Sequence, residues 1–135
     1  MAEITAHYSP ASALTLFVAE GRILADDLVA AIETHYGANP TSITIWDLWK
    51  ADLSELDMPA LTRVSDCARN FSKNRENPRT IFVVRREQEK LLIKLYKKIS
   101  EVRGSPTSYE LHPSLNAAYE ALDLADPFTG QRKSA

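Results

Sequence analysis

Apolar and polar residues along the chain follow two periods, one typical of strands and the other typical of helices. Short segments rich in β-branched and aromatic residues predict five strands. These strands cover residues 4–8, 14–20, 42–48, 80–84 and 107–111. Apolar residues three or four positions apart predict four helices. These helices cover residues 25–37, 58–71, 87–103 and 115–122.

The order of these elements, β-β-α-β-α-β-α-β-α, predicts an α/β fold. Helices between successive strands imply crossover connections and therefore a mixed, mostly parallel sheet of four or five strands with about four helices. The segment from Ser42 to Leu48 is apolar on both faces for most of its length, which favours a central strand. With no internal repeat, we expect a single domain over residues 1–125 and a polar C-terminal tail over residues 126–135.

Composition agrees with one ordinary soluble domain. The chain has 135 residues, of which 44% are hydrophobic and 25% are charged. Its single cysteine cannot form an internal disulfide and suits a reducing compartment. No apolar run is long enough to span a membrane, and the N-terminus lacks the basic region of a signal peptide. We therefore expect a cytoplasmic protein, with peripheral membrane contact left open.

The sequence contains no recognisable catalytic or cofactor-binding motif. His7, His35 and His112 fall on different predicted elements and do not have the spacing of metal ligands. No pair of its four glycines opens a helix after a strand, so phosphate-binding loops and the dinucleotide fingerprint are absent. A Gly-x-Ser-x-Gly nucleophile motif is also absent. We predict that the protein is not an enzyme and binds no metal or cofactor.

Asp47 is the most unusual polar residue, because it interrupts an apolar strand near its carboxyl end. Open α/β sheets place their binding crevices at that edge. Trp46 and Trp49 flank Asp47, and Asp52 and Asp57 follow within ten residues. Two interpretations remain open. Either Asp47 belongs to a ligand or partner site, or its carboxylate hydrogen-bonds backbone amides of the following loop.

Charge is distributed unevenly along the chain. Residues 1–68 contain three basic and ten acidic side chains, whereas residues 69–103 contain eleven basic and four acidic ones. The net charges of these two regions are −7 and +7. The second region predicts a basic face, which is either merely solvated or contacts an anionic partner or membrane. Nucleic acid is not an expected partner, because the overall charge is −2 and few aromatic residues are interleaved with the basic ones.

The longest predicted helix contains one apolar residue that does not fit its core face. At about 100° per residue, that core face consists of Leu92, Leu95, Tyr96, Ile99 and Val102, with Leu91 at its margin. Ile93 falls outside it, among basic residues. An exposed apolar side chain surrounded by cations is typical of an anchor at an anionic membrane surface. The predicted membrane or anionic-partner face consists of Arg86, Lys90, Ile93, Lys94 and Lys97, with Lys98 beside it.

Two short motifs resemble a known family. The segment Ile43-Thr44-Ile45-Trp46-Asp47-Leu48 resembles the strand ending in Asp-Leu of STAS domains, the fold of bacterial anti-sigma factor antagonists. The run from Ile45 to Leu48, followed by Ala51-Asp52-Leu53-Ser54 and a helix, is similar to the SpoIIAA-like group of small bacterial proteins. The resemblance covers the chain from about Ile4 to Leu124.

This resemblance also implies a difference in regulation. The antagonists have an Asp-Ser-Ser-Gly-Leu run at the start of the next helix, where a partner kinase phosphorylates a serine. The corresponding run in this chain is Asp57-Met58-Pro59-Ala60-Leu61, which lacks both serines and the glycine. Ser54, three residues before this run, is the nearby serine that could substitute for them. The group is also similar in fold to lipid-carrying Sec14-type domains, which implies an apolar ligand or a membrane role.

We therefore interpret the chain as a non-enzymatic SpoIIAA-like binding module. Its partner is a hydrophobic small molecule or lipid, a membrane surface or a protein. The alternative is a STAS-type regulator, similar to an anti-sigma factor antagonist, that lacks the usual phosphoacceptor serine. The predicted ligand or partner site consists of Trp46, Asp47, Trp49, Ser54, Asp57 and Met58.

The uneven charge predicts a homodimer, because regions of opposite charge in one protomer offer complementary surfaces to a second copy. Sedimentation at low and at moderate salt should show dimers at micromolar protein concentration, with more dissociation at the higher salt. A strict monomer in both buffers would contradict this prediction.

Overall fold

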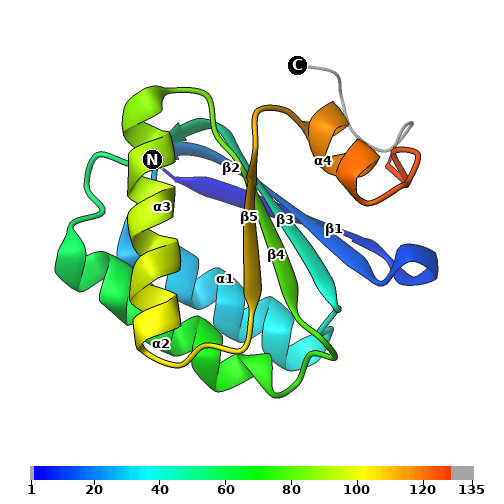
Figure 1. Ribbon diagram of the computed structural model, residues 1–135, viewed down its shortest axis with the longest axis horizontal. Helices are drawn as coiled ribbons and strands as arrows, with labels where there is room; N and C mark the ends of the chain where they lie inside the picture. Colours follow the sequence, from blue (N-terminus) through cyan, green and yellow to red (C-terminus); the bar gives the residue numbers. More distant parts are fainter. Residues whose placement is uncertain (1, 129–135) are drawn as a thin grey trace.

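One sheet contains all five strands, side by side in the order in which they occur along the chain (Figure 1). The structure is a computed structural model, and it describes residues 2–128. The strands are β1 (Glu3–Ser9), β2 (Leu14–Arg22), β3 (Ile43–Asp52), β4 (Arg79–Val83) and β5 (Ser108–His112). The helices are α1 (Ala25–Ala38), α2 (Met58–Ser72), α3 (Glu87–Val102) and α4 (Leu115–Ala121), with a short 3-10 helix η1 (Pro10–Ser12).

The strand directions follow from the connections. Strands β1 and β2 form an antiparallel hairpin through η1, and Ala13 closes this turn with a positive φ of 49°. Each later pair is parallel, because α1, α2 and α3 carry the chain back between successive strands. The predicted fold class, a mixed and mostly parallel sheet with four α-helices, is confirmed.

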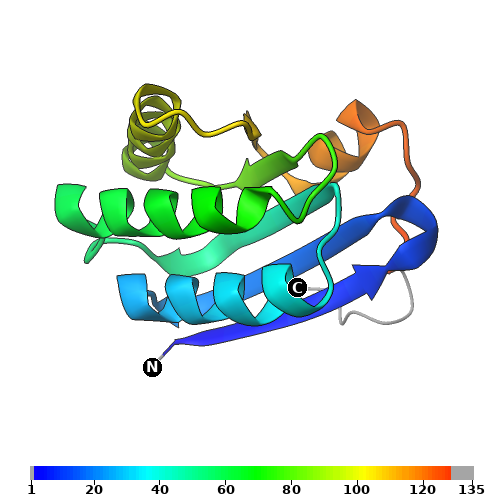
Figure 2. The same ribbon diagram turned by 90° about the horizontal axis from the view of Figure 1, so that it is seen from below.

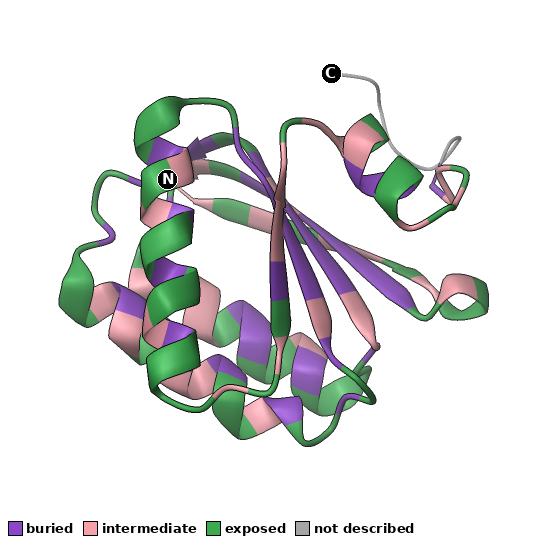
Figure 3. Ribbon diagram, viewed as in Figure 1, coloured by how far each residue is buried: buried purple, intermediate pink, exposed green. Residues whose placement is uncertain are grey.

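The sheet is covered on both faces. Phe17, Trp46 and Phe82 contribute to the larger core, which packs against α1, α2 and α3. Leu16 and Ile45 contribute to a smaller core, which packs against α4. Helices α1 and α2 lie side by side (Figure 2), and the central strands are largely buried (Figure 3). Strand β3 is apolar on both sides because it lies in the middle of this arrangement.

Strand β3 extends beyond the segment that the sequence pattern predicted, and a bulge lies where that pattern stops. Val18 lies opposite Asp47 and Glu20 lies opposite Lys50, so β3 has one more residue than β2 between these pairs. The strand then continues to Asp52 rather than ending near Leu48. An extra residue reverses the alternation of side chains, which explains why the simple strand pattern stops there.

The buried face of α3 differs from the predicted one. Ile93, expected to be an exposed anchor, is only 7% exposed, whereas Leu91 and Val102 are 63% and 79% exposed. The prediction counted apolar residues alone, but the buried face includes two polar residues. Glu89 accepts a hydrogen bond from the Arg86 N–H (3.1 Å), and the Ser100 hydroxyl bonds to a serine of α2. The helix is therefore rotated toward Ile93.

The segment after α4 contributes to the core. Phe128 lies in the predicted polar tail, but it is 1% exposed and belongs to the smaller core with Leu14 and Ala118. Its backbone N–H donates to Asp126 Oδ1 (2.8 Å), which fixes the turn that precedes it. The core therefore extends past residue 125, and the rest of the predicted tail, residues 129–135, lies outside the described residues.

The burial of Phe128 predicts that this segment stabilises the domain. We expect Phe128→Ala to lower the free energy of unfolding by about 3–5 kcal/mol, the usual cost of truncating a buried phenylalanine. Denaturant unfolding measures this. The control Val102→Ala, at an exposed position, should change it by less than about 0.5 kcal/mol. Equal stabilities for Phe128→Ala and the unmodified chain would show that Phe128 is not docked in solution.

Candidate functional site

The loop between β3 and α2 lies at the carboxyl edge of the sheet and is held by its own backbone contacts. Leu53 and Leu56 are buried, and the Leu56 N–H donates to the Leu53 carbonyl (3.1 Å). The side chain of Asp57 caps α2 by accepting a hydrogen bond from the Ala60 N–H (3.0 Å), as the sequence predicted. The loop therefore presents Ser54 to solvent from a fixed position.

Charged side chains tie this loop to its neighbours. Arg22, at the end of β2, forms an ion pair with Glu55. The Ser54 N–H donates to Asp52 Oδ1 (3.0 Å). Hydrogen bonds from Ser54 lower the pKa of Asp52, and the charges of Arg22 and Arg86 lower it further. The lowered pKa makes the Asp52 carboxylate a weak base, and its Oδ1 already accepts a loop N–H, so it is poorly suited to act as a general base.

Asp47 also serves the backbone. The Trp49 N–H donates to Asp47 Oδ1 (3.1 Å) across the bulge in β3. This matches the interpretation that Asp47 bonds a backbone amide, although the amide belongs to the strand rather than to the following loop. Trp49 itself is exposed, and the guanidinium of Arg85 lies 5.6 Å from the centre of its ring.

Trp46 lies in the core, away from the exposed members of the predicted site. Its ring stacks on Phe17 with the ring centres 4.2 Å apart, and its Nε1–H donates to the Tyr36 hydroxyl (3.4 Å). The structure therefore separates the six predicted residues. Trp49, Ser54, Asp57 and Met58 are exposed at the carboxyl edge, Asp47 is half-buried in the strand, and Trp46 is buried.

Three large apolar side chains are exposed on segments at this edge. Met58 is 54% exposed at the first position of α2, and Trp49 is exposed near the end of β3. Leu24, which the sequence analysis missed, is exposed at the start of α1. It directly follows Ile23, whose N–H donates to the Asp52 carbonyl (3.0 Å), so it lies at the same edge. We call Leu24, Trp49 and Met58 the carboxyl-edge patch.

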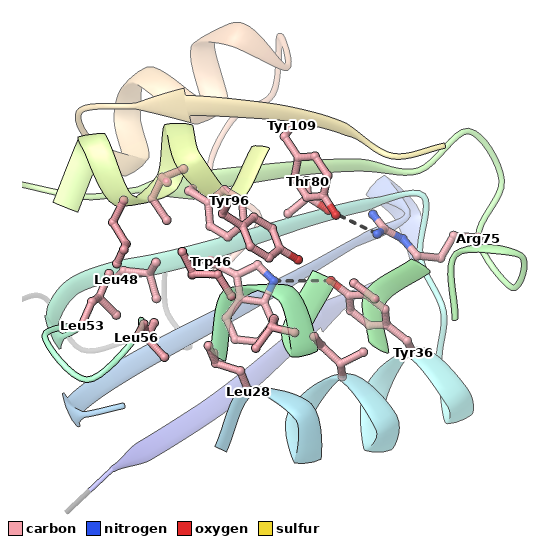
Figure 4. Close-up of a pocket in the computed structure, with 17 residues that line it drawn as sticks. Leu28, Tyr36, Trp46, Leu48, Leu53, Leu56, Arg75, Thr80, Tyr96 and Tyr109 are labelled. Atoms are coloured by element: carbon pink, nitrogen blue, oxygen red, sulfur yellow. Dashed lines mark hydrogen bonds between the residues drawn. The ribbon is translucent and has the colours of Figure 1, made fainter. Parts of the chain in front are cut away.

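A cavity of about 50 Å³ lies between the sheet and α1, α2 and α3 (Figure 4). Most of its lining is apolar, with Leu48, Leu53 and Leu56 at one end. Arg75 and Thr80 lie at the other end, together with tyrosine hydroxyls. Sequence reasoning missed Arg75 because residues 72–79 have the composition of an exposed polar loop, and nothing in that pattern indicates a buried cation.

The predicted basic face is only partly free. Lys90 forms an ion pair with Glu87 (3.1 Å), and the backbone of Arg86 precedes α3 as its N-cap. Lys94 and Lys97 are exposed and line a hollow of about 150 Å³ between α3 and β5, with Ile93 at its base. Ile93 therefore contributes to the core and to the floor of this hollow, and it cannot insert into a membrane.

Within residues 2–128, no group of three or more His, Cys, Asp or Glu side chains could hold a metal ion. No helix in the same part of the chain is long and apolar enough to cross a membrane.

Comparison with known proteins supports the fold. An anti-sigma factor antagonist from Mycobacterium paratuberculosis superposes with a TM-score of 0.60 at 17% identity, covering 91% of this chain and 95% of that one. A protein of the DUF3478 family with a SpoIIAA-like fold, from Shewanella loihica PV-4, gives 0.56 at 15% identity and covers 90% and 91%. No family model and no curated protein matches the sequence. The chain therefore has a SpoIIAA-like, STAS-like fold, as its motifs indicated.

Proposed function

We propose that this protein is a non-enzymatic, STAS-type regulator that binds a protein partner through the carboxyl-edge patch. The observation that carries this proposal is the exposure of Leu24, Trp49 and Met58 on segments at one edge of the sheet. Apolar and aromatic side chains are the usual anchors of protein interfaces. The structural neighbour named as an anti-sigma factor antagonist supports a protein partner of this general kind.

The patch is supported by a preorganised scaffold. Arg22 pairs with Glu55 on the loop, and Arg63 of α2 pairs with Asp26 in the first turn of α1. These contacts, with the cap at Asp57, join the segments that carry Leu24 and Met58. A surface that is already ordered loses little conformational entropy when it binds, which favours affinity.

Regulation in this proposal does not use the usual phosphorylation. Met58 and Pro59 stand at the positions of the family's serines, and neither has a hydroxyl. Met58 instead offers an apolar contact at the start of α2. Ser54 is exposed, but its loop position precedes the helix, and its N–H already bonds Asp52.

We expect Met58→Asp to weaken partner binding by about tenfold or more, because it places a charge in an apolar contact. Cross-linking of tagged protein in its own cells identifies the partner, and calorimetry with purified components measures affinity. An acidic residue suits the first turn of a helix, so the fold should be kept. The control Leu91→Asp, at an exposed position of α3, should bind the partner as the unmodified chain does.

Ser54 separates this proposal from a displaced phosphorylation switch. Ser54→Ala and Ser54→Glu should both bind the same partner with affinities within about twofold of the unmodified chain. This difference is much smaller than the loss of affinity expected when an anchor side chain is removed from the interface. Normal binding by Met58→Asp would contradict the docking surface. Loss of binding by Ser54→Glu alone would favour a phosphorylation switch at Ser54.

A second candidate function is contact with an anionic membrane through α3. Leu91, Leu95 and Val102 are exposed on this helix, with Lys94 and Lys98 beside them. Exposed apolar side chains flanked by lysines are typical of helices that lie at a membrane surface. These three residues replace Ile93 as the apolar anchor.

This membrane contact predicts salt-sensitive co-sedimentation with vesicles of phosphatidylserine and phosphatidylcholine. Lys94→Glu with Lys98→Glu should nearly abolish this binding, because the lysines are attracted to the anionic headgroups. Leu91→Ser with Leu95→Ser should reduce it, because the leucines bury apolar surface in the membrane. The control Met58→Asp should bind as the unmodified chain does. Absence of binding at low salt, or binding unchanged by the charge reversals, would contradict this function.

A further inference from the structure

Strand β5 is an edge of the sheet, because within residues 2–128 it pairs only with β4. The Ser108 N–H donates to the Pro78 carbonyl (2.9 Å), so Ser108 directs its backbone groups toward β4. In a parallel pair every second residue does this, and the residues between them direct their groups away from the partner. Tyr109 and Leu111 therefore turn their N–H and C=O groups toward the open edge, where these groups are available to another strand.

The hollow between α3 and β5 borders this open edge. Tyr109, Glu110 and Leu111 all line it, although successive side chains of a strand point to opposite faces. A hollow that touches three successive residues runs along the edge of the strand rather than over one face. Helix α3 lies alongside β5 (Figure 1) and forms the opposite wall, with Lys94 and Lys97. A segment that paired with β5 would therefore lie against α3.

The floor of the hollow is apolar and large enough for one aliphatic side chain. Ile93, Tyr109 and Leu111 line it. Its volume is about 150 Å³, which is roughly the volume of a cavity that admits benzene. The isobutyl group of a leucine has fewer carbon atoms than benzene and therefore fits. An apolar side chain that fills such a hollow is a usual anchor of a protein interface.

The rim of the hollow is basic. Lys94 and Lys97 are exposed, and neither forms an ion pair within residues 2–128. Glu110 also lines the hollow, but its carboxylate already accepts a hydrogen bond from Arg79 Nη2 (2.9 Å). The two lysines therefore favour an occupant with acidic side chains, because opposite charges across an interface select the partner.

The apolar floor and the basic rim together specify a pattern of side chains in the occupant. In an extended segment, residues two positions apart point to the same face and lie about 6.7 Å apart. When an aliphatic residue fills the hollow, the residues two positions before and after it therefore also face α3. Lys94 and Lys97 are about 4.5 Å apart along the helix axis. Acidic side chains at those two positions lie within reach of these flexible lysines.

The C-terminal residues of this chain and a second copy of it match this pattern poorly. Residues 129–135 contain two basic side chains and no acidic one, so they do not complement the lysines. Strand β1, at the other edge of the sheet, contains one acidic residue, Glu3. Glu3 shares its face with Thr5 and His7 rather than with an aliphatic side chain. A segment of a different protein is the better match.

We propose that the open edge of β5 binds an extended acidic segment of a partner protein as a sixth strand of the sheet. An aliphatic side chain of the segment fills the hollow, and acidic side chains two positions before and after it pair with Lys94 and Lys97. The backbone of the segment bonds Tyr109 and Leu111. In this mode of recognition, backbone pairing gives affinity and the alternate side chains give specificity. The surface shares no residue with the carboxyl-edge patch and does not rest on it.

The test titrates the ¹⁵N-labelled full chain with the acetylated and amidated peptide Thr-Glu-Thr-Leu-Thr-Glu-Thr, followed by NMR. The amide signals of Tyr109 and Leu111 should shift and exchange more slowly with solvent, because their N–H groups gain acceptors. The amide of Glu110 should change less, because it faces β4.

Two altered peptides separate the contributions of charge and of the apolar anchor. Replacement of both glutamates with glutamine should weaken binding about fivefold, the loss expected for two exposed ion pairs. Replacement of the leucine with asparagine should weaken binding about tenfold or more, because the hollow loses its apolar occupant. Neither change alters the fold of the protein.

Two neighbouring lysines of α3 provide a matched pair of variants. Lys97 lines the hollow, whereas Lys98 is exposed on the same helix and does not line it. Lys97→Glu should weaken binding of the acidic peptide about fivefold, because it replaces an attraction with a repulsion. Lys98→Glu makes the same change in net charge and should stay within about twofold of the unmodified chain at about 0.15 M salt, which screens distant charges.

Several results would overturn the proposal. Two of them are measured on the unmodified chain, namely no binding of the acidic peptide at millimolar concentration and equal affinities for the glutamate and glutamine peptides. Equal losses in Lys97→Glu and Lys98→Glu would show that only the overall charge matters. A dimer that Lys97→Glu dissociates in sedimentation would show that a second copy occupies the edge. Met58→Asp should bind the peptide normally, so failure here is distinguishable from failure of the proposed partner surface.

Discussion

The fold depends on a buried polar network at the amino edge of the sheet. Arg75 holds the carbonyls that precede β3 and begin β4. Beside it, hydroxyl hydrogen bonds join Thr44 to Thr80 and Thr15 to Thr41, both at 2.9 Å. Because side chains alternate along a strand, fixing the register at one edge also decides which residues face each core. This network therefore sets the position of Trp46 and of the carboxyl edge beyond it.

The two edges of the sheet differ because they satisfy different requirements. At the amino edge, polar groups are buried and must bond one another, which makes this end rigid. At the carboxyl edge, Asp52 bonds a loop amide, Asp57 bonds an amide in the first turn of α2, and apolar side chains such as Met58 are left in solvent. The acidic residues that the sequence places here therefore hold the loop and the start of α2 in position. The neighbouring apolar residues are the ones available for contact.

The sequence pattern predicted the strands, helices and caps well, because period and capping chemistry are local. It failed where tertiary contacts override apolar periodicity. The orientation of α3 depends on Glu89 and Ser100, which are polar yet buried because each has a partner. The bulge at Asp47 is a relation between two strands, so one strand alone cannot indicate it. Arg75 is buried by loops that meet only in the folded chain.

The cavity and the carboxyl-edge patch are separate in their contacts but share one structural element. Leu53 and Leu56 line the cavity, and the same loop carries Ser54 and ends at the cap of α2. Displacing either leucine would move the loop, because well-packed side chains transmit a shift only where they are in contact. A change in the cavity lining at Leu53 or Leu56 would therefore reach the carboxyl-edge patch through this loop, whereas a change elsewhere in the lining has no such direct connection.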